Sequence, residues 1–112
     1  MREVVIVDAI RTPLGRRGGV LSQNQPIETS ALLLKELAKR NNLDPEIVDD
    51  VIYGCVSEVG AQSTNLARNV VLTAGWPYTI PGVTLERQCS SSQQAVHFAA
   101  NQIASEAHEV VV

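Results

Sequence analysis

Short apolar runs rich in β-branched residues alternate with helical patterns along this chain, and the alternation constrains its fold more than any other feature. The apolar runs cover residues 4–7, 51–56, 83–85 and 110–112, and each predicts a strand. Between them, apolar residues spaced three and four apart predict three helices. The order β-α-β-α-β-α-β predicts right-handed crossovers and a mostly parallel sheet covered by helices, which is an α/β fold.

The three predicted helices are marked by their ends and by their apolar faces. Pro26 suits the first helical position, because proline lacks the N–H that is unpaired there. Ser63 is the predicted N-cap of the second helix and Gly75 its end, and the third helix is expected to begin near Ser90. Asp44 is expected to cap one short helical turn. The predicted apolar positions are Ala31, Leu34, Leu37 and Ala38, then Leu66, Val70, Val71 and Ala74, and finally Val96, Ala99, Ala100, Ile103 and Ala107.

The charge balance excludes several classes of partner. Lys and Arg number 9 against 12 Asp and Glu, so the formal net charge is −3. The basic cluster of Arg11, Arg16 and Arg17 lies in a Gly-rich stretch and is interpreted as a solvated loop, so no nucleic-acid partner is expected. No run of about 18 apolar residues occurs, so neither a membrane span nor a signal peptide is predicted.

The two cysteines, Cys55 and Cys89, are too few for a disulfide framework, and their separation fits no zinc pattern. A reducing compartment is therefore expected, and the cytoplasm is the default location. No cluster of His, Cys, Asp and Glu has the spacing of metal ligands, so no metal is predicted. Asp49 and Asp50 precede a predicted strand and are interpreted as a solvated turn.

Residues 86–95 are the segment that points most clearly to chemistry. They place Cys89 between a strand and a helix, at the carboxyl end of a parallel sheet, where ligands bind in such folds. The free N–H groups and the dipole at a helix N-terminus stabilise a thiolate, which is the nucleophilic form of cysteine. The small residues 90–92 would let a substrate approach the backbone closely. A buried structural cysteine beside a serine cap explains the pattern equally well at this point.

The same segment, Glu-Arg-Gln-Cys-Ser-Ser-Ser-Gln-Gln-Ala, resembles the active-site signature of thiolases. Residues 5–15 resemble the opening strand and the Arg-Thr-Pro loop of that family, and residues 51–56 resemble its second strand. Residues 65–68, Asn-Leu-Ala-Arg, are similar to a helix start of the family, and residues 75–82 resemble the turn before its third strand. The resemblance covers essentially all 112 residues, and the matching segments come in the same order.

The resemblance implies acyl transfer between thiols, with Cys89 as the nucleophile that takes the acyl group. The acyl-Cys89 intermediate would then be attacked by CoA, in thiolysis of a 3-ketoacyl-CoA, or by the enolate of acetyl-CoA, in a Claisen condensation. The Cys89 backbone N–H is expected to donate to the developing oxyanion. CoA and acyl-CoA are substrates in this scheme, no separate cofactor is implied, and no substrate-binding residue is assigned.

The chain lacks three strings that the family also uses. These are Gly-His-Pro with the histidine base, Asn-Glu-Ala-Phe, and Cys-x-Gly with the second cysteine. His97 lies eight residues into the helix, about 12 Å from Cys89 along the axis, which is too far for a general base. His108 is expected at the opposite end of the sheet from the active loops. Cys55 lies in a predicted strand, where cysteine behaves as a small hydrophobe.

The resemblance also implies a thiolase-like three-layer α/β/α fold, of which this chain forms an incomplete N-terminal half. Because residues 110–112 form a strand-like run at the last position, we expect residues 1–112 to be an N-terminal domain that is cut within its fourth strand. Members of the family are homodimers or homotetramers, so the intact protein is expected to be a homo-oligomer.

Two alternatives to an acyltransferase stay open at this stage. The first is a non-catalytic fragment, or one chain of a split enzyme that needs a complementary chain, because the base and the second cysteine are missing. The second is a redox protein that uses the reactive Cys89 alone, which would be sensitive to peroxide and would take up no acyl group.

Overall fold

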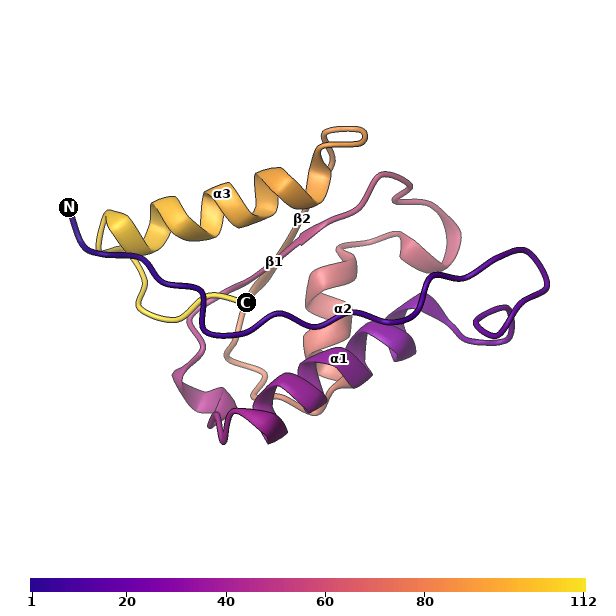
Figure 1. The fold of residues 1–112 in the computed structure, drawn as a ribbon, viewed down its shortest axis with the longest axis horizontal. Coiled ribbons are helices and arrows are strands. Elements are labelled where there is room, and N and C mark those ends of the chain that lie inside the picture. The colour runs from indigo at the N-terminus through magenta and orange to yellow at the C-terminus, as the bar shows by residue number, and fades with distance from the viewer.

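The computed structural model describes residues 1–112 and contains a parallel pair of strands with helices on both sides (Figure 1). The helices are α1 (Pro26–Arg40), α2 (Leu66–Thr73) and α3 (Ser91–Ala104), and the strands are β1 (Val51–Gly54) and β2 (Gly82–Leu85). Short 3-10 turns cover Pro45–Ile47 and Gly60–Gln62. β1 and β2 pair in parallel, with Val51 opposite Gly82 and Gly54 opposite Leu85.

The elements form three layers, as the α/β pattern predicts. Figure 1 shows α3 along one side of the strand pair, and α1 and α2 along the other. α3 packs mainly on β1, while α2 contacts both strands and α1 packs on α2. The crossover from β1 to β2 contains α2, and because the two strands run parallel their carboxyl ends lie at the same edge of the sheet.

The last residues extend the sheet beyond β1. Val110 accepts a hydrogen bond from the N–H of Asp49, and Val112 exchanges two bonds with Asp50 and Ile52, at N···O distances of 2.8–3.1 Å. Asp50 and Val111 form a parallel bridge. The strand predicted at 110–112 is thereby confirmed as a hydrogen-bonded neighbour of β1, on the edge opposite β2.

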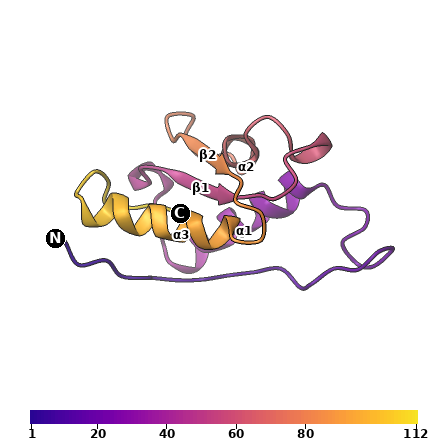
Figure 2. The ribbon, with the colours of Figure 1, turned by 90° about the horizontal axis from the view of Figure 1, so that it is seen from above.

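The strand predicted at residues 4–7 is wrong for this structure. Val5, Ile6 and Val7 are 65%, 81% and 80% exposed, and the run has no strand beside it, as Figure 2 shows for the indigo N-terminal segment. The next residue, Asp8, is bound to the end of α1 instead. Its carboxylate lies 2.7 Å from the Arg40 guanidinium and 2.6 Å from the Asn41 amide nitrogen. A β-branched run favours extended backbone, but a strand also needs a partner with free backbone groups.

The predicted helices are confirmed, with shifts at their starts. α2 is capped by Asn65, whose side chain accepts the Arg68 N–H, and Ser63 lies in the turn before it. α3 starts at Ser91, one residue later than expected. In α3 the buried face is centred on Ala95, at 6% exposure, and the predicted apolar residue Val96 is 57% exposed. Alanine adds little to an apolar pattern, and the larger valine beside it therefore led to the wrong prediction of which face of α3 is buried.

The core lies between α1, α2 and the strands. Twelve buried residues form it: Ala31, Leu34, Val48, Val51, Cys55, Leu66, Ala67, Val70, Val71, Ala74, Trp76 and Ile80. Tyr53 packs against this cluster, and burial raises the pKa of its hydroxyl to about 12. Asp44 caps the first 3-10 turn as predicted, because its side chain accepts the N–H of Glu46.

The solvated turn predicted at Asp49 and Asp50 is wrong. Asp50 is buried, and its carboxylate accepts hydrogen bonds from the N–H of Val51 and, at 3.5 Å, from the Gln102 side chain. Asp49 accepts the N–H groups of Glu109 and Val110. Backbone N–H groups that have no ladder partner favour a carboxylate beside them, and this demand overrides the preference of aspartate for water.

Candidate active site

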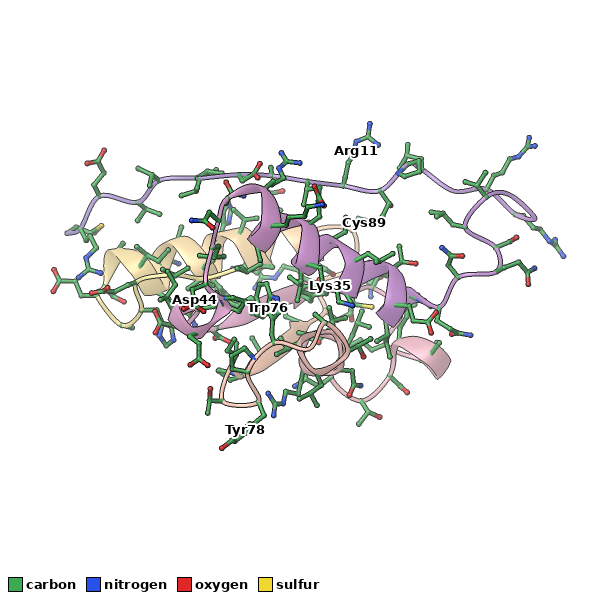
Figure 3. The ribbon with its side chains drawn as sticks, turned by 90° about the horizontal axis from the view of Figure 1, so that it is seen from below. Arg11, Lys35, Asp44, Trp76, Tyr78 and Cys89 are labelled. Atoms are coloured by element: carbon green, nitrogen blue, oxygen red, sulfur yellow. The ribbon has the colours of Figure 1, made fainter.

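The link between β2 and α3 carries Cys89, at the carboxyl end of the parallel pair. Cys89 is exposed and its thiol is free (Figure 3). It stands two residues before the first residue of α3, and Ser90 occupies the N-cap position without a side-chain cap bond. The alternative of a buried structural cysteine beside a serine cap is therefore wrong for Cys89. The prediction of a cysteine between a strand and a helix start is confirmed.

The link is a tight turn held by its own polar groups. Gln88 has a φ of +47°, a left-handed conformation that non-glycine residues rarely adopt. The Glu86 carboxylate accepts the Gln88 N–H, and the Arg87 carbonyl accepts the Ser90 N–H at 3.0 Å. These bonds reverse the chain between β2 and α3 and present Cys89 at the outside of the turn.

The backbone N–H of Cys89 donates to no acceptor of this chain. A backbone N–H without a partner in its own chain is free to donate to an anionic oxygen of a bound molecule. Cys89 thus offers a thiol and a hydrogen-bond donor from one residue, which is the pair of groups that nucleophilic attack on a carbonyl requires.

The other residues considered as partners of Cys89 lie elsewhere. His97 is exposed on α3 and lines an open polar groove of about 300 Å³ together with Arg87, Ser90, Gln93 and Gln94. His108 follows the far end of α3, where its carbonyl accepts the Arg2 guanidinium at 3.5 Å. Cys55 is 8% exposed and belongs to the core, as expected for a structural cysteine.

The structure shows neither a group of metal ligands nor a membrane-spanning helix. No group of three or more His, Cys, Asp or Glu side chains is arranged to hold a metal ion. None of the helices is both long enough and apolar enough to cross a bilayer. In the basic loop, the Arg11 guanidinium donates to the carbonyl of its neighbour Thr12 at 3.0 Å.

Ser91 is the residue of the segment whose burial was not predicted from the sequence. The expectation that residues 90–92 all let a substrate approach is wrong for Ser91, which is 3% exposed while its two neighbours are exposed. Its hydroxyl bonds back to the link, at Arg87 and Gln88. A serine three residues after the tightest point of a turn is the available signal, because serine hydroxyls often bond to nearby backbone.

Comparison with known proteins places this arrangement in a family. The sequence profile described as "Thiolase, N-terminal domain" matches residues 4–112. The chain is 47% identical over 112 residues to a steroid 3-ketoacyl-CoA thiolase of Mycobacterium tuberculosis, covering 100% of this chain and 28% of that protein. It is 48% identical over 105 residues to a 3-ketoacyl-CoA thiolase of Pseudoalteromonas translucida, covering 92% of this chain and 27% of the relative.

A solved structure shows the same fold. The crystal structure of the Bacillus anthracis acetyl-CoA acetyltransferase superimposes with a TM-score of 0.75 at 41% sequence identity, over 84% of this chain and 24% of that one. The chain thus spans about a quarter of the length of the proteins that it matches. The profile match over nearly all residues, together with these identities, shows that the chain belongs to the thiolase family.

Proposed function

We propose that this protein is an acyltransferase of acyl-CoA metabolism and that Cys89 is its acyl-accepting nucleophile. The observation that carries the proposal is the exposed, free thiol of Cys89 in the link between β2 and α3. The reaction is thiolysis of a 3-ketoacyl-CoA or, in the opposite direction, Claisen condensation that begins with acetyl-CoA. CoA and its thioesters are the substrates, and no additional cofactor is part of the proposal.

The first half of the reaction forms the acyl-enzyme. The Cys89 thiolate attacks the carbonyl carbon, a new C–S bond forms, and the carbonyl oxygen becomes an oxyanion. When the carbonyl reforms from an acyl-CoA donor, the old C–S bond breaks and the CoA thiolate leaves with the electron pair. From a 3-ketoacyl-CoA, attack at the 3-keto carbon breaks the C–C bond instead, and the acetyl-CoA enolate leaves and takes up a proton.

The second half returns the enzyme to its free form. A CoA thiolate, or the enolate of acetyl-CoA, attacks the acyl group, and the Cys89 thiolate leaves. Sulfur suits both halves, because a thiolate is a strong nucleophile and also a good leaving group. The free N–H of Cys89 supports the proposed role as a donor to the oxyanion.

The proton acceptor in this scheme is a group other than His97. The side chain of His97 is exposed. His97 follows Cys89 by eight positions, which corresponds to about 12 Å along the helix axis at 1.5 Å per residue. A general base must come within about 3 Å of its proton or act through one water.

The names of the relatives support the substrate class but differ in the acyl part. They include a steroid 3-ketoacyl-CoA thiolase, and, at 46% identity over 104 residues, a 3-oxoadipyl-CoA/3-oxo-5,6-dehydrosuberyl-CoA thiolase of Escherichia coli. A 3-ketoacyl-CoA thioester is the chemistry that these names share. The proposal is therefore limited to that class and specifies no acyl chain.

Thiolysis of acetoacetyl-CoA by free CoA tests the proposed function. We expect the protein, as its gene encodes it, to consume acetoacetyl-CoA and to form two acetyl-CoA, with parallel-line ping-pong kinetics. The Cys89→Ala variant should lose turnover, and Cys55→Ala is the matched control that removes the buried cysteine. Turnover that survives Cys89→Ala would refute the assignment.

We also propose that the protein works as a homo-oligomer. β2 is an edge strand of the sheet, its outer backbone groups face no other strand, and Val83 on it is 44% exposed. Edges of this kind pair readily with a second copy. Light scattering coupled to gel filtration should give a mass of two or four chains, and a monomer mass at micromolar concentration would contradict the proposal.

A further inference from the structure

We propose that Ser91 is a positioning residue for Cys89, because its buried hydroxyl clamps the turn that carries the nucleophile. The inference rests on the proposed role of Cys89 and extends it to a side chain that never touches the substrate. Ser91 is 3% exposed, and it is one of only two buried polar or charged residues in the chain. Such a residue needs its hydrogen bonds satisfied internally.

The Ser91 hydroxyl makes two bonds, both to the backbone just before Cys89. It accepts the N–H of Arg87 at 2.9 Å and donates to the carbonyl of Gln88 at 2.6 Å. The Ser91 N–H reaches the same Gln88 carbonyl at 3.2 Å. The first turn of α3 is thereby tied to the two residues that precede the nucleophile.

The clamp acts on a strained residue. Gln88 has a φ of +47°, and the left-handed region costs a side-chain-bearing residue about 1–2 kcal/mol. The conformation persists only when the surroundings hold it. The bonds from Ser91, together with the Glu86 carboxylate on the Gln88 N–H, are the contacts that hold it here.

The anchor itself is fixed to the sheet. A Cβ at Gly54, the last residue of β1, would overlap the backbone of Ser91 and Ser92, so β1 and the start of α3 meet backbone to backbone. Ser91 therefore holds the turn at Gln88 in a fixed position relative to β1. Cys89, the next residue, takes its place and the direction of its free N–H from that turn.

Removing the hydroxyl should slow acyl transfer without weakening substrate binding. In Ser91→Ala we expect kcat for thiolysis, and the rate of Cys89 acetylation by acetyl-CoA, to fall on the order of tenfold or more, because small misplacements of reacting groups have effects of that size. KM for acetoacetyl-CoA should stay within about twofold. kcat is to be expressed per chain whose Cys89 can be acetylated, because a general loss of fold would lower that number of chains and leave kcat per acetylatable chain at the parental value.

The matched control is Ser105→Ala. Ser105 follows the other end of α3 and makes the same kind of bond, from its hydroxyl to the carbonyl three residues earlier, at 3.1 Å to Gln102. This variant should keep parental kcat and KM. An equal loss in Ser105→Ala would show that any helix-end hydroxyl matters and would overturn the proposal.

Changes at Gln88 separate positioning from a general structural effect. Gln88→Val should reproduce the loss with Ser91 intact, because β-branched residues resist positive φ. Gln88→Asn, which enters the left-handed region more easily, should restore part of the rate when combined with Ser91→Ala. Additive losses in that double variant would overturn the clamp.

Acetylation of Cys89 in the parent and in Ser91→Ala distinguishes a failure of this inference from a failure of the proposed function. If the parent protein takes up no acetyl group on Cys89, the proposed function fails. If the parent is acetylated on Cys89 and Ser91→Ala is acetylated at the same rate, the positioning role fails and the proposed function stands.

Discussion

At the scale of single residues, two glycines decide how closely the helices approach the sheet. Gly54 ends β1 against the first turn of α3, and Gly82 begins β2 against the first turn of α2, where a Cβ would lie 2.6 Å from the Arg68 nitrogen. Neither glycine has a positive φ, so both are needed for space rather than for conformation. Each glycine thus fixes the start of one helix against the backbone of one strand.

Gly54→Ala should therefore destabilise the fold and disturb the active link together. Overpacking of this kind costs about 1–3 kcal/mol, and the atoms in the way are backbone rather than a movable side chain. We expect a lower midpoint in urea denaturation and slower acetylation of Cys89.

Gly15→Ala is the control for that substitution. A Cβ at Gly15 would meet only the Leu21 side chain, at 3.3 Å, which can move away. Equal stability losses in the two variants would contradict the close approach between β1 and α3.

At the scale of elements, polar bonds seat α2 on β2. The Thr84 hydroxyl of β2 accepts the Ala67 N–H and donates to the Asn65 side chain, both at 2.9 Å, and the Asn65 amide donates to the Gly82 carbonyl at 2.8 Å. Asn65 holds a φ of +57° at the N-cap position. One strand hydroxyl thus satisfies an N–H that the first turn of α2 leaves unpaired.

Thr84→Val tests this junction while keeping the shape of the side chain. It leaves the Ala67 N–H without an acceptor, and we expect the free energy of unfolding to fall by about 1–3 kcal/mol. Thr73→Val, at the exposed end of α2, should change it by no more than about 0.5 kcal/mol. A loss at Thr84 as small as the loss at Thr73 would show that the hydroxyl bonds carry no net stability.

The carboxylate of Asp49, two residues before β1, helps the backbone bonds to hold the segment at 109–112. Hydrogen bonds from the N–H groups of Val110 and Glu109 lower the pKa of Asp49 below its ordinary value of 3.8. A carboxyl whose pKa is depressed in the folded state stabilises that state above the unfolded pKa, and the contribution is lost as the pH falls through the folded pKa. Stability should therefore decline below about pH 4, in part through Asp49.

Asp49→Asn should flatten this acid dependence. Urea midpoints measured from neutral pH down to pH 3 should fall less steeply in Asp49→Asn than in the parent. The residual slope should respond to Asp8→Asn, because the Asn41 side chain, the Ala9 N–H and Arg40 also lower the pKa of Asp8. Parallel acid profiles for Asp49→Asn and the parent would rule out the Asp49 contribution.

At the scale of the whole molecule, the sequence patterns predicted the strands and helices that pack against one another in this chain. β1, β2 and the run at 110–112 were predicted from β-branched residues, and β1 is found hydrogen-bonded to β2 on one edge and to the run at 110–112 on the other. Residues 4–7 carry the same local signal and form no strand here, because a local pattern does not specify a partner.

The candidate site was predictable to the same extent. The place of Cys89 between β2 and α3 follows from the strand and helix patterns around it, and its exposure agrees with that place. The clamp by Ser91 was not predictable, because a buried serine that bonds to the preceding turn looks in sequence like any serine at a helix start. The positive φ at position 88 was not predictable either, because the residue there is glutamine and not glycine or asparagine, which adopt this conformation more often.

Mass spectrometry of the protein after incubation with acetyl-CoA tests the central claim most directly. We predict one acetyl group per chain on the peptide that contains Cys89, none on the peptide that contains Cys55, and release of the group when CoA is added. Cys89→Ala should take up none, while Cys55→Ala should behave like the parent. Parent protein without acetyl on Cys89, or with acetyl that persists in excess CoA, would contradict acyl transfer through this cysteine.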